Sequence, residues 1–420
     1  MLSGCWRTRQ AAETLAGFRE EITLGGPPFT QVARAQTQTG YESKNHGAKA
    51  RTPPLSSRKV VGADARGSAD WIGEIASSVV LDTAFAWLCQ RRIDYADSAD
   101  VWNVRRRWPS LKLQLQHDLL SGQYRFSPLR RIQIDGECIE LWAALDALVL
   151  KVLAMVLNRR LDFPKSCYHV PSKAGEEKRG AKAAVRRICS RLASNQFVFR
   201  SDVKSYYASI DHAVLLNLVR DSIDDPLLLD LVAQYLHRTV DENCLCSTVT
   251  IGISLGCPLS PVMAAIYLEP LDRRMQATGL TYARFMDDWV ILAPSRWSLR
   301  RAIRTVNETL QELRVEQHPD KTFIGRIERG FTFLGYWITA KGVTGVAPSA
   351  WQGFQERVVR LYEQECAARG GNPAEHRAMR PALEAVGTRW CAGSQRIVRV
   401  AGGSASLRRT LVPRPLSPSP

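Results

Sequence analysis

The chain has 420 residues, of which 45% are hydrophobic, and it carries a formal net charge of +16. This length and apolar content exclude a largely disordered protein and leave room for two or three domains around a large core. The ten cysteines show neither zinc spacing nor a disulfide framework, so free thiols are expected. Because no apolar run is long enough to cross a bilayer, the sequence predicts a cytoplasmic protein with no membrane partner.

The positive charge is concentrated in one part of the chain. Residues 101–200 contain 19 Lys and Arg but only 8 Asp and Glu. Such a basic segment favours a polyanionic partner, most simply nucleic acid, because Lys and Arg neutralise phosphates without regard to base sequence. A membrane surface is the alternative partner, but no Lys-rich amphipathic helix supports it.

The first part of the chain divides into three segments. Residues 1–70 lack periodic apolar residues and are expected to be disordered; an over-extended gene start is the alternative, which N-terminal sequencing of the native protein would decide. Residues 71–120 have apolar side chains at helical spacing and predict an N-terminal helical region. Residues 124–139 form two alternating runs around Asp135 and Gly136, which predicts a β-hairpin. Arg130 and Arg131 lie near its base, where they can contact a triphosphate.

The middle of the chain contains the first candidate catalytic carboxylate. A long apolar helix is expected over residues 139–161, and a basic loop and helix that track a nucleic-acid backbone over residues 165–191. Residues 197–199 predict a buried strand that ends at Asp202. The next helix begins near Ser209 or Asp211, and Asp211 is expected to cap it rather than bind a ligand.

Residues 252–261 are expected to open a buried helix. Ser260 suits its N-cap, and Pro261 suits its first turn. Gly252 and Gly256 permit the backbone to approach a bound partner closely, although both are also ordinary turn residues.

Two adjacent carboxylates, Asp287 and Asp288, separate two apolar runs within residues 282–292. The pattern predicts a tight hairpin with the aspartates at its tip. Neighbouring carboxylates repel each other, so a divalent cation is the simplest reason for placing them together. A solvated turn is the alternative, but it does not explain Asp202 at the end of another strand.

The remaining sequence predicts a helix over residues 299–313 and a second hairpin over residues 331–346, with its turn at residues 340–342. An Arg-rich helical region follows, and the Pro-rich tail, residues 406–420, is expected to be disordered. Strands that bring Asp202 and Asp287 together would create a site for two divalent ions, which clamp the attacking and leaving oxygens of a phosphoryl displacement. Mg²⁺ suits such a site, with Mn²⁺ as the alternative.

The ordered set of motifs resembles the reverse transcriptases of prokaryotes, a group that includes intron-encoded, retron-like and defence-associated enzymes. The similar segments are residues 199–207, residues 252–261, the Asp–Asp pair preceded by Phe285, Lys321, and residues 333–335. The resemblance covers about residues 120–345. It implies an α+β right-hand fold of fingers, palm and thumb, in which the palm has an antiparallel sheet packed on helices.

The resemblance also implies domain bounds and an activity. Fingers and palm are expected over residues 121–345, and a helical thumb over residues 346–405. The implied activity is RNA-directed DNA synthesis from dNTPs on an RNA template and primer, with a cognate non-coding RNA as a further partner.

Residue roles carry over position by position. Asp202 and Asp287 are expected to bind the metals with support from Asp288, and the carbonyl of Val203 to complete one coordination sphere. Lys321 is expected to donate a proton to pyrophosphate, although a solvated lysine is equally consistent with the sequence. The ring of Tyr207 matches the gate that excludes a ribose 2′-hydroxyl. Gly256 and the arginines of the first hairpin are expected to contact the incoming nucleotide.

Three departures from the family pattern affect the interpretation. Phe285 and Leu255 stand where many relatives have Tyr and Gln, and nothing in the sequence resembles an HNH nuclease. The missing nuclease and the short C-terminal segment make a stand-alone polymerase, as in antiviral defence or on a gene cassette, the expectation rather than an intron maturase. The alternatives are a catalytically idle RNA-binding scaffold, or a palm polymerase that makes RNA or adds nucleotides without a template.

Overall fold

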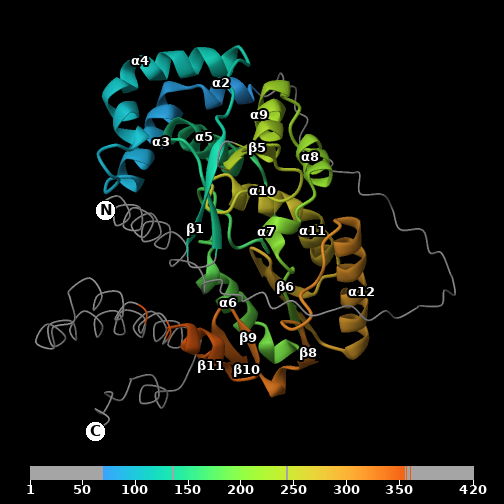
Figure 1. Cartoon of the computed structure of the whole chain (residues 1–420). Coiled ribbons are helices and arrows are strands. Elements are labelled where there is room, and N and C mark those ends of the chain that lie inside the picture. Colours follow the sequence, from blue (N-terminus) through green and yellow to red (C-terminus); the bar gives the residue numbers. More distant parts are fainter. Residues whose placement is uncertain (1–69, 135–136, 243–244, 355, 357–359, 361–420) are drawn as a thin grey trace, which may run out of the picture.

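The computed structural model describes residues 70–134, 137–242 and 245–354, together with residues 356 and 360 (Figure 1). The segment expected to be disordered, residues 1–70, lies outside this part of the chain except for Asp70. The expected tail and most of the expected thumb also lie outside it. None of the helices in the described residues is both long and apolar enough to cross a bilayer.

Four helices form the upper part of the molecule in Figure 1: α2 (Trp71–Ile75), α3 (Ser78–Arg91), α4 (Asp100–Leu120) and α5 (Ala144–Arg160). The first three fall within the helical region expected over residues 71–120. Most of α5 is buried, because apolar side chains occupy nearly every position of its sequence. The predicted start of this helix at residue 139 was wrong, since residues 139–141 continue the preceding strand.

The first predicted hairpin is present as β1 (Leu129–Ile134) and β2 (Glu137–Leu141), which pair antiparallel. A second antiparallel pair, β4 (Thr239–Glu242) and β5 (Leu245–Thr248), extends this sheet in the order β2-β1-β4-β5. The sequence analysis did not identify β4 and β5. They join the sheet through a parallel contact between β1 and β4, which strand patterns within the sequence do not reveal.

The palm sheet has the order β6-β7-β3-β8, and all its neighbouring strands are antiparallel. Its strands are β3 (Phe197–Ser201), β6 (Thr281–Phe285), β7 (Asp288–Ala293) and β8 (Phe323–Arg326). Alternating side chains cover its two faces, as the period of two requires. Phe199 and Trp289 belong to the main core, which includes residues of α12 (Arg296–Glu312), whereas Val198 and Val290 belong to a second core with residues of α6 (Ala181–Cys189).

A third sheet contains β9 (Phe331–Phe333), β10 (Tyr336–Thr339) and β11 (Gly342–Val346). The predicted hairpin turn between β10 and β11 is present, but the prediction of one strand before it was wrong. Leu334 and Gly335 have φ angles of 47° and 81°, so the chain turns there and β9 pairs antiparallel with β10.

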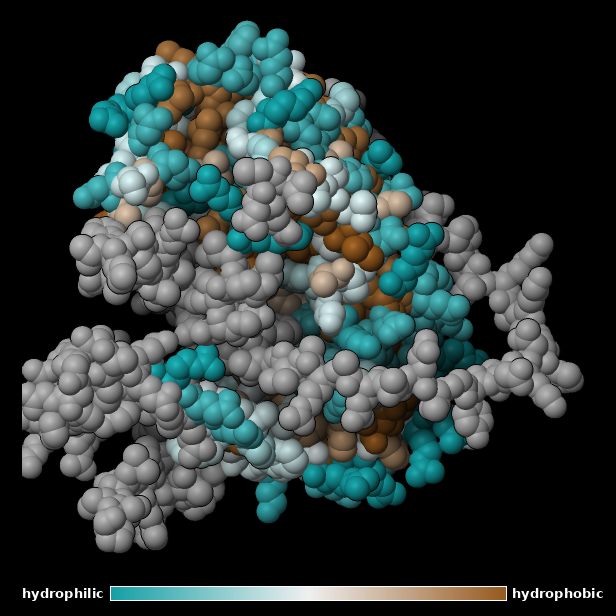
Figure 2. Space-filling model, viewed as in Figure 1, coloured by the Kyte–Doolittle hydropathy of each residue, from teal (hydrophilic) through white to brown (hydrophobic). Residues whose placement is uncertain are grey.

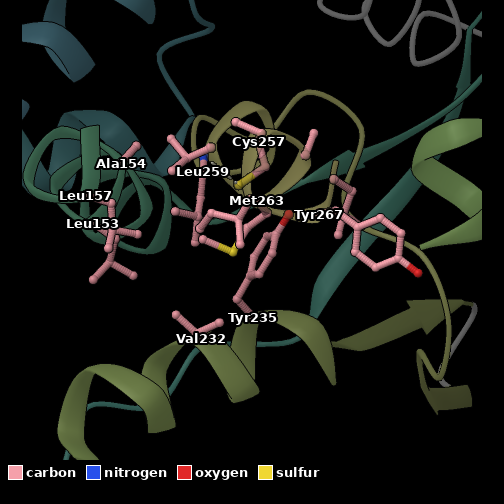
Figure 3. Packing of buried hydrophobic residues seen from close by; sticks show 14 of the residues in the cluster. Leu153, Ala154, Leu157, Val232, Tyr235, Cys257, Leu259, Met263 and Tyr267 are labelled. Carbon is pink, nitrogen blue, oxygen red and sulfur yellow. Dashed lines mark hydrogen bonds between the residues drawn. The ribbon is translucent and has the colours of Figure 1, made fainter. Parts of the chain in front are cut away.

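The helix α10 (Ser260–Tyr267) lies at the centre of the molecule. Figure 3 shows its Met263 close to Tyr235 of α9 (Pro226–Leu236), with the apolar side chains of α5 nearby. The N-cap of α10 is Leu259 rather than the predicted Ser260. Ser260 is fully buried, so its hydroxyl needs partners within the protein. It donates a 2.5 Å hydrogen bond to the carbonyl oxygen of Ser254 and contacts the hydroxyl of Tyr235.

Between β3 and α9 lie two helices, α7 (Tyr206–Ser209) and α8 (His212–Arg220). The predicted cap of the second is confirmed: the side chain of Asp211 accepts a 3.0 Å hydrogen bond from the amide of Val214. The helix α11 (Glu269–Ala277) leads into the palm hairpin. The fold is therefore α+β with an antiparallel palm sheet packed on helices, as predicted.

Candidate active site at one end of the palm sheet

The three predicted aspartates lie together at one end of the palm sheet. Ser201 pairs with Trp289 across the antiparallel strands β3 and β7. Asp202 comes directly after Ser201 and Asp288 directly before Trp289, so both lie at the same end of these strands. Phe285 pairs with Asp288 across β6 and β7, which places Asp287 in the two-residue turn between them. The pairing of strands that are distant in sequence therefore assembles the carboxylates that the sequence singled out.

Burial of this group changes its ionisation. Asp287 is only 4% exposed, and burial, together with the charge of nearby Asp202, raises the pKa of Asp287 to about 7. Burial likewise raises the pKa of Asp288 to about 6, although the guanidinium of Arg200 opposes this shift. Both directions follow from the cost of crowding carboxylates in a site of low polarity.

Two cations neutralise part of the charge. The Nζ atom of Lys321 lies 2.7 Å from Oδ2 of Asp202. The Nε atom of Arg200 lies 3.4 Å from Oδ1 of Asp288, with an alignment that leaves both atoms without a hydrogen bond. Lys321 was predicted at the site, whereas Arg200 was missed. Its sequence signal was an arginine within an otherwise apolar strand, two residues before Asp202.

The carboxylate oxygens of this site are of the kind that divalent cations bind. In the described residues, no group of three or more His, Cys, Asp or Glu is already arranged around a metal position. Nevertheless, Oδ1 of Asp202, Oδ2 of Asp287 and Oδ1 of Asp288 are all buried without a hydrogen-bond partner. Buried carboxylate oxygens without partners are costly, and Mg²⁺ prefers oxygen ligands of this kind.

The predicted Val203 is buried beside Asp202. Two backbone hydrogen bonds flank it: the amide of Lys204 donates to the carbonyl of Glu316, and the amide of His318 donates to the carbonyl of Asp202. The carbonyl of Val203 takes no part in these two bonds. The hydroxyl of Tyr207 lies 3.9 Å from the sulfur of Met286, so the predicted gate contacts the turn that carries Asp287.

The predicted glycine, Gly256, lies in the loop before α10 with a φ of 86°. The neighbouring Gly252 has a φ of 83°, and its amide donates to the carbonyl of Ile210. The amide of Ile253 donates to the carbonyl of Tyr207. The loop therefore supports the backbone around the candidate gate.

The two arginines of the first hairpin differ in their surroundings. Arg130 is exposed, whereas Arg131 forms a 3.1 Å ion pair with Glu140. Glu140 also pairs with buried Arg238 at 2.6 Å, a network that the sequence analysis missed. Both arginines belong to the β2-β1-β4-β5 sheet, so the structure does not place them on the palm sheet with the aspartates.

Comparisons with known proteins show which family the central part of the chain resembles. Residues 143–338 match the family model described as reverse transcriptase (RNA-dependent DNA polymerase). The chain is 23% identical over 278 residues to protein YkfC of Escherichia coli K12, covering 55% of this chain and 72% of YkfC. It is 22% identical over 230 residues to the group II intron-encoded protein LtrA of Lactococcus lactis subsp. cremoris, covering 53% of this chain but only 36% of LtrA.

Among solved structures, the chain is similar to telomerase from Candida albicans, solved with a fragment of telomeric RNA. The TM-score is 0.40 at 11% identity, and the match covers 61% of this chain and 48% of the telomerase chain.

The matched segment, residues 143–338, contains the palm sheet strands β3, β6, β7 and β8, the helix α10 and all three aspartates. Residues 143–338 of the chain therefore match the reverse transcriptase (RNA-dependent DNA polymerase) family.

Proposed function

We propose that this protein extends a primer with dNTPs on an RNA template by two-metal nucleotidyl transfer. The observation that supports this most directly is the set of three buried carboxylate oxygens without hydrogen-bond partners, contributed by Asp202, Asp287 and Asp288. In this proposal, fingers and palm occupy residues 121–345, the N-terminal helices precede them, and residues 346–405 form the thumb.

Each site residue has a distinct task in this proposal. Asp202 and Asp287 hold Mg²⁺ or Mn²⁺, with Asp288 and the carbonyl of Val203 in support. When bound, the metal ions activate the primer hydroxyl and neutralise charge on the triphosphate. Lys321 is already within 2.7 Å of Asp202 and donates its proton to the leaving pyrophosphate.

Two further tasks concern the nucleotide. Tyr207 excludes a 2′-hydroxyl, because its ring occupies the position next to the turn that carries Asp287. Arg130, which is exposed, is the better placed of the two hairpin arginines to meet a triphosphate, since Arg131 is paired with Glu140.

The proposal is tested by primer extension with the purified chain and Mg²⁺. We expect DNA product on a primed RNA template, and a loss of at least about 10³-fold in Asp287→Asn, because removing a metal-binding charge leaves the reaction without its main electrostatic stabilisation. Asp224→Asn, which changes an exposed aspartate, is the matched control and should retain activity. Activity retained in Asp287→Asn would disprove the assignment.

Additional reactions separate the alternatives. Product from NTPs indicates RNA synthesis, and product without template indicates untemplated addition. A biological function that survives Asp287→Asn indicates a scaffold. Activity without an added protein supports a stand-alone enzyme, and cell fractionation tests the expected cytoplasmic location.

A phage challenge of cells with and without the gene tests the proposed role in antiviral defence. RNA recovered with the protein from those cells tests for a cognate non-coding RNA.

A further inference from the structure

We propose that His169 is a positioning residue, which holds the turn that carries Asp287 and joins it to the first turn of α10. This inference rests on the proposed function, because it assigns the turn a role in catalysis. Its structural basis is a set of contacts to the two peptide groups of Met286.

The turn between β6 and β7 contains a backbone conformation that needs support. Met286 has a φ of 56°, in the left-handed region that side chains other than glycine rarely adopt. Such a conformation is energetically unfavourable and persists only where the surroundings enforce it. Asp287 is the next residue, so a relaxed turn would move its carboxylate.

His169 contacts this turn from a loop that is distant in sequence. Its Nδ1 atom lies 3.1 Å from the amide nitrogen of Met286, and its Nε2 atom lies 3.2 Å from the carbonyl oxygen of Pro261. The amide can only donate and the carbonyl can only accept, so the ring must be neutral with its proton on Nε2. Burial and the charges of Arg284 and Arg179 lower the pKa of His169 well below its usual range, which keeps this form.

A second side chain holds the other side of Met286. Nη1 of Arg284 donates a 2.6 Å hydrogen bond to the carbonyl oxygen of Met286. The guanidinium is fully buried and forms a bidentate pair with Asp272 of α11 at 2.7 Å and 2.5 Å. The hydroxyl of Tyr282 donates to the same aspartate at 2.8 Å. Both peptide groups of the strained residue are therefore held by side chains from distant parts of the chain, half-buried His169 and fully buried Arg284.

His169 differs from Arg284 in what it connects. Pro261 lies in the first turn of α10, directly after the loop that supports the backbone of Tyr207. One imidazole therefore joins the segment expected to receive the nucleotide to the segment expected to hold the metal. Loss of this connection should affect the chemical step more than the binding of template.

The test compares two substitutions of broadly similar size that differ in hydrogen-bonding capacity. His169→Phe removes both hydrogen bonds, whereas His169→Gln retains one acceptor and one donor. We expect His169→Phe to lower kcat about 10- to 100-fold, with less than a threefold change in KM for the primed template, and His169→Gln to recover much of this loss. The exposed His117→Gln is the matched control. Circular dichroism and Tm identify any variant that fails to fold.

A second readout does not require polymerase activity. Mn²⁺ binding, measured by electron paramagnetic resonance, should weaken about 5- to 20-fold in His169→Phe and less in His169→Gln. If the wild-type protein binds Mn²⁺ but makes no DNA, the proposed function fails and this readout still tests His169. Wild-type values of kcat and Mn²⁺ affinity in His169→Phe, or equal losses in folded Phe and Gln variants, would overturn the inference.

A separate observation concerns the outer face of α12. Arg296, Arg300 and Arg304 recur at every fourth position and are exposed, and Arg301 lies one turn from Trp297. Trp297 is 73% exposed, and the guanidinium of Arg300 lies 5.1 Å from its ring centroid. None of these four arginines forms an ion pair with another residue of the described chain. Figure 2 shows hydrophilic side chains over the lower end of this region.

From this face we infer a second contact for single-stranded RNA, away from the catalytic end of the palm sheet. The helix begins after β7 ends, and β7 extends about 17 Å from Asp288 to Ala293. Exposed arginines neutralise phosphates, and an exposed tryptophan is a surface on which a base can stack. The combination of both on one helix face fits a single strand better than it fits a duplex.

Fluorescence anisotropy with a labelled single-stranded RNA tests this surface. We expect Arg300→Ala/Arg304→Ala to weaken binding about 5- to 20-fold and to reduce the dependence of affinity on salt, because two phosphate contacts are lost. Trp297→Ala should weaken binding without changing the salt dependence. The control Arg220→Ala/Lys341→Ala removes the same charge from exposed positions elsewhere. Unchanged affinity, equal losses in the control, or preferential binding to anionic vesicles would overturn this inference.

Discussion

At the scale of single residues, the carboxylates of the palm oppose folding when no cation is bound. The pKa of Asp287 is raised to about 7, so ionising it costs the folded state free energy that the unfolded chain does not lose. The stability that this group contributes is therefore fully present below the unfolded pKa of about 4, is lost progressively as the pH rises, and is gone above the folded pKa of about 7. We expect Asp287→Asn to raise the Tm of the metal-free protein at pH 8 by a few degrees, equivalent to on the order of 2 kcal/mol, and to raise it less at pH 5, where only part of the ionisation penalty has appeared. Thermal denaturation in a chelator measures this; a larger gain at pH 5 than at pH 8 would contradict it.

At the scale of elements, the loop before α10 holds the candidate gate in place through Gly252. A Cβ atom at this position would lie 3.0 Å from the carbonyl oxygens of Tyr207 and Ala208, and the φ of 83° is itself unfavourable for alanine. We expect Gly252→Ala to displace Tyr207, raising KM for dNTPs and increasing the incorporation of ribonucleotides. Gly279→Ala is the matched control, because Gly279 has a φ of 68° but no atom within 4 Å of an added Cβ. Incorporation assays with dNTP and NTP mixtures compare the two variants, and equal nucleotide selectivity in both would show that the loop does not position the gate.

At the scale of the whole molecule, the net charge of +16 should dominate association with RNA. A protein that contacts about six phosphates loses roughly 10³-fold in affinity between 50 and 200 mM salt, because counterions are no longer released as favourably. We expect a loss of this order for a primed RNA template, with a smaller effect on kcat once the complex is saturated. Binding titrations across a salt series measure it, and an affinity that does not depend on salt would contradict the expectation.

Much of the fold and the positions of the candidate carboxylates were predictable from the sequence. Apolar alternation around Asp287 and Asp288 predicted a hairpin, and the buried run before Asp202 predicted a strand end, because strand and turn patterns are local properties of the chain. The cap formed by Asp211 was predictable for the same reason. The break at Leu334 was missed because the aromatic and β-branched residues on both sides favour strands; the turn signal, Gly335, is decisive only once β9 pairs with β10.

Only the tertiary structure decided which charged and polar residues act on these carboxylates. Arg200 is an ordinary strand residue until β3 pairs with β7 and brings it to Asp288. His169 and Met286 are 117 residues apart. A lone histidine in a loop gives no sign of which backbone amide will donate a hydrogen bond to it. The sequence determined where the candidate catalytic groups are, because each local pattern specifies its own strand or turn. The tertiary structure determined their ionisation and support, because burial and distant partners exist only once the strands and helices have packed.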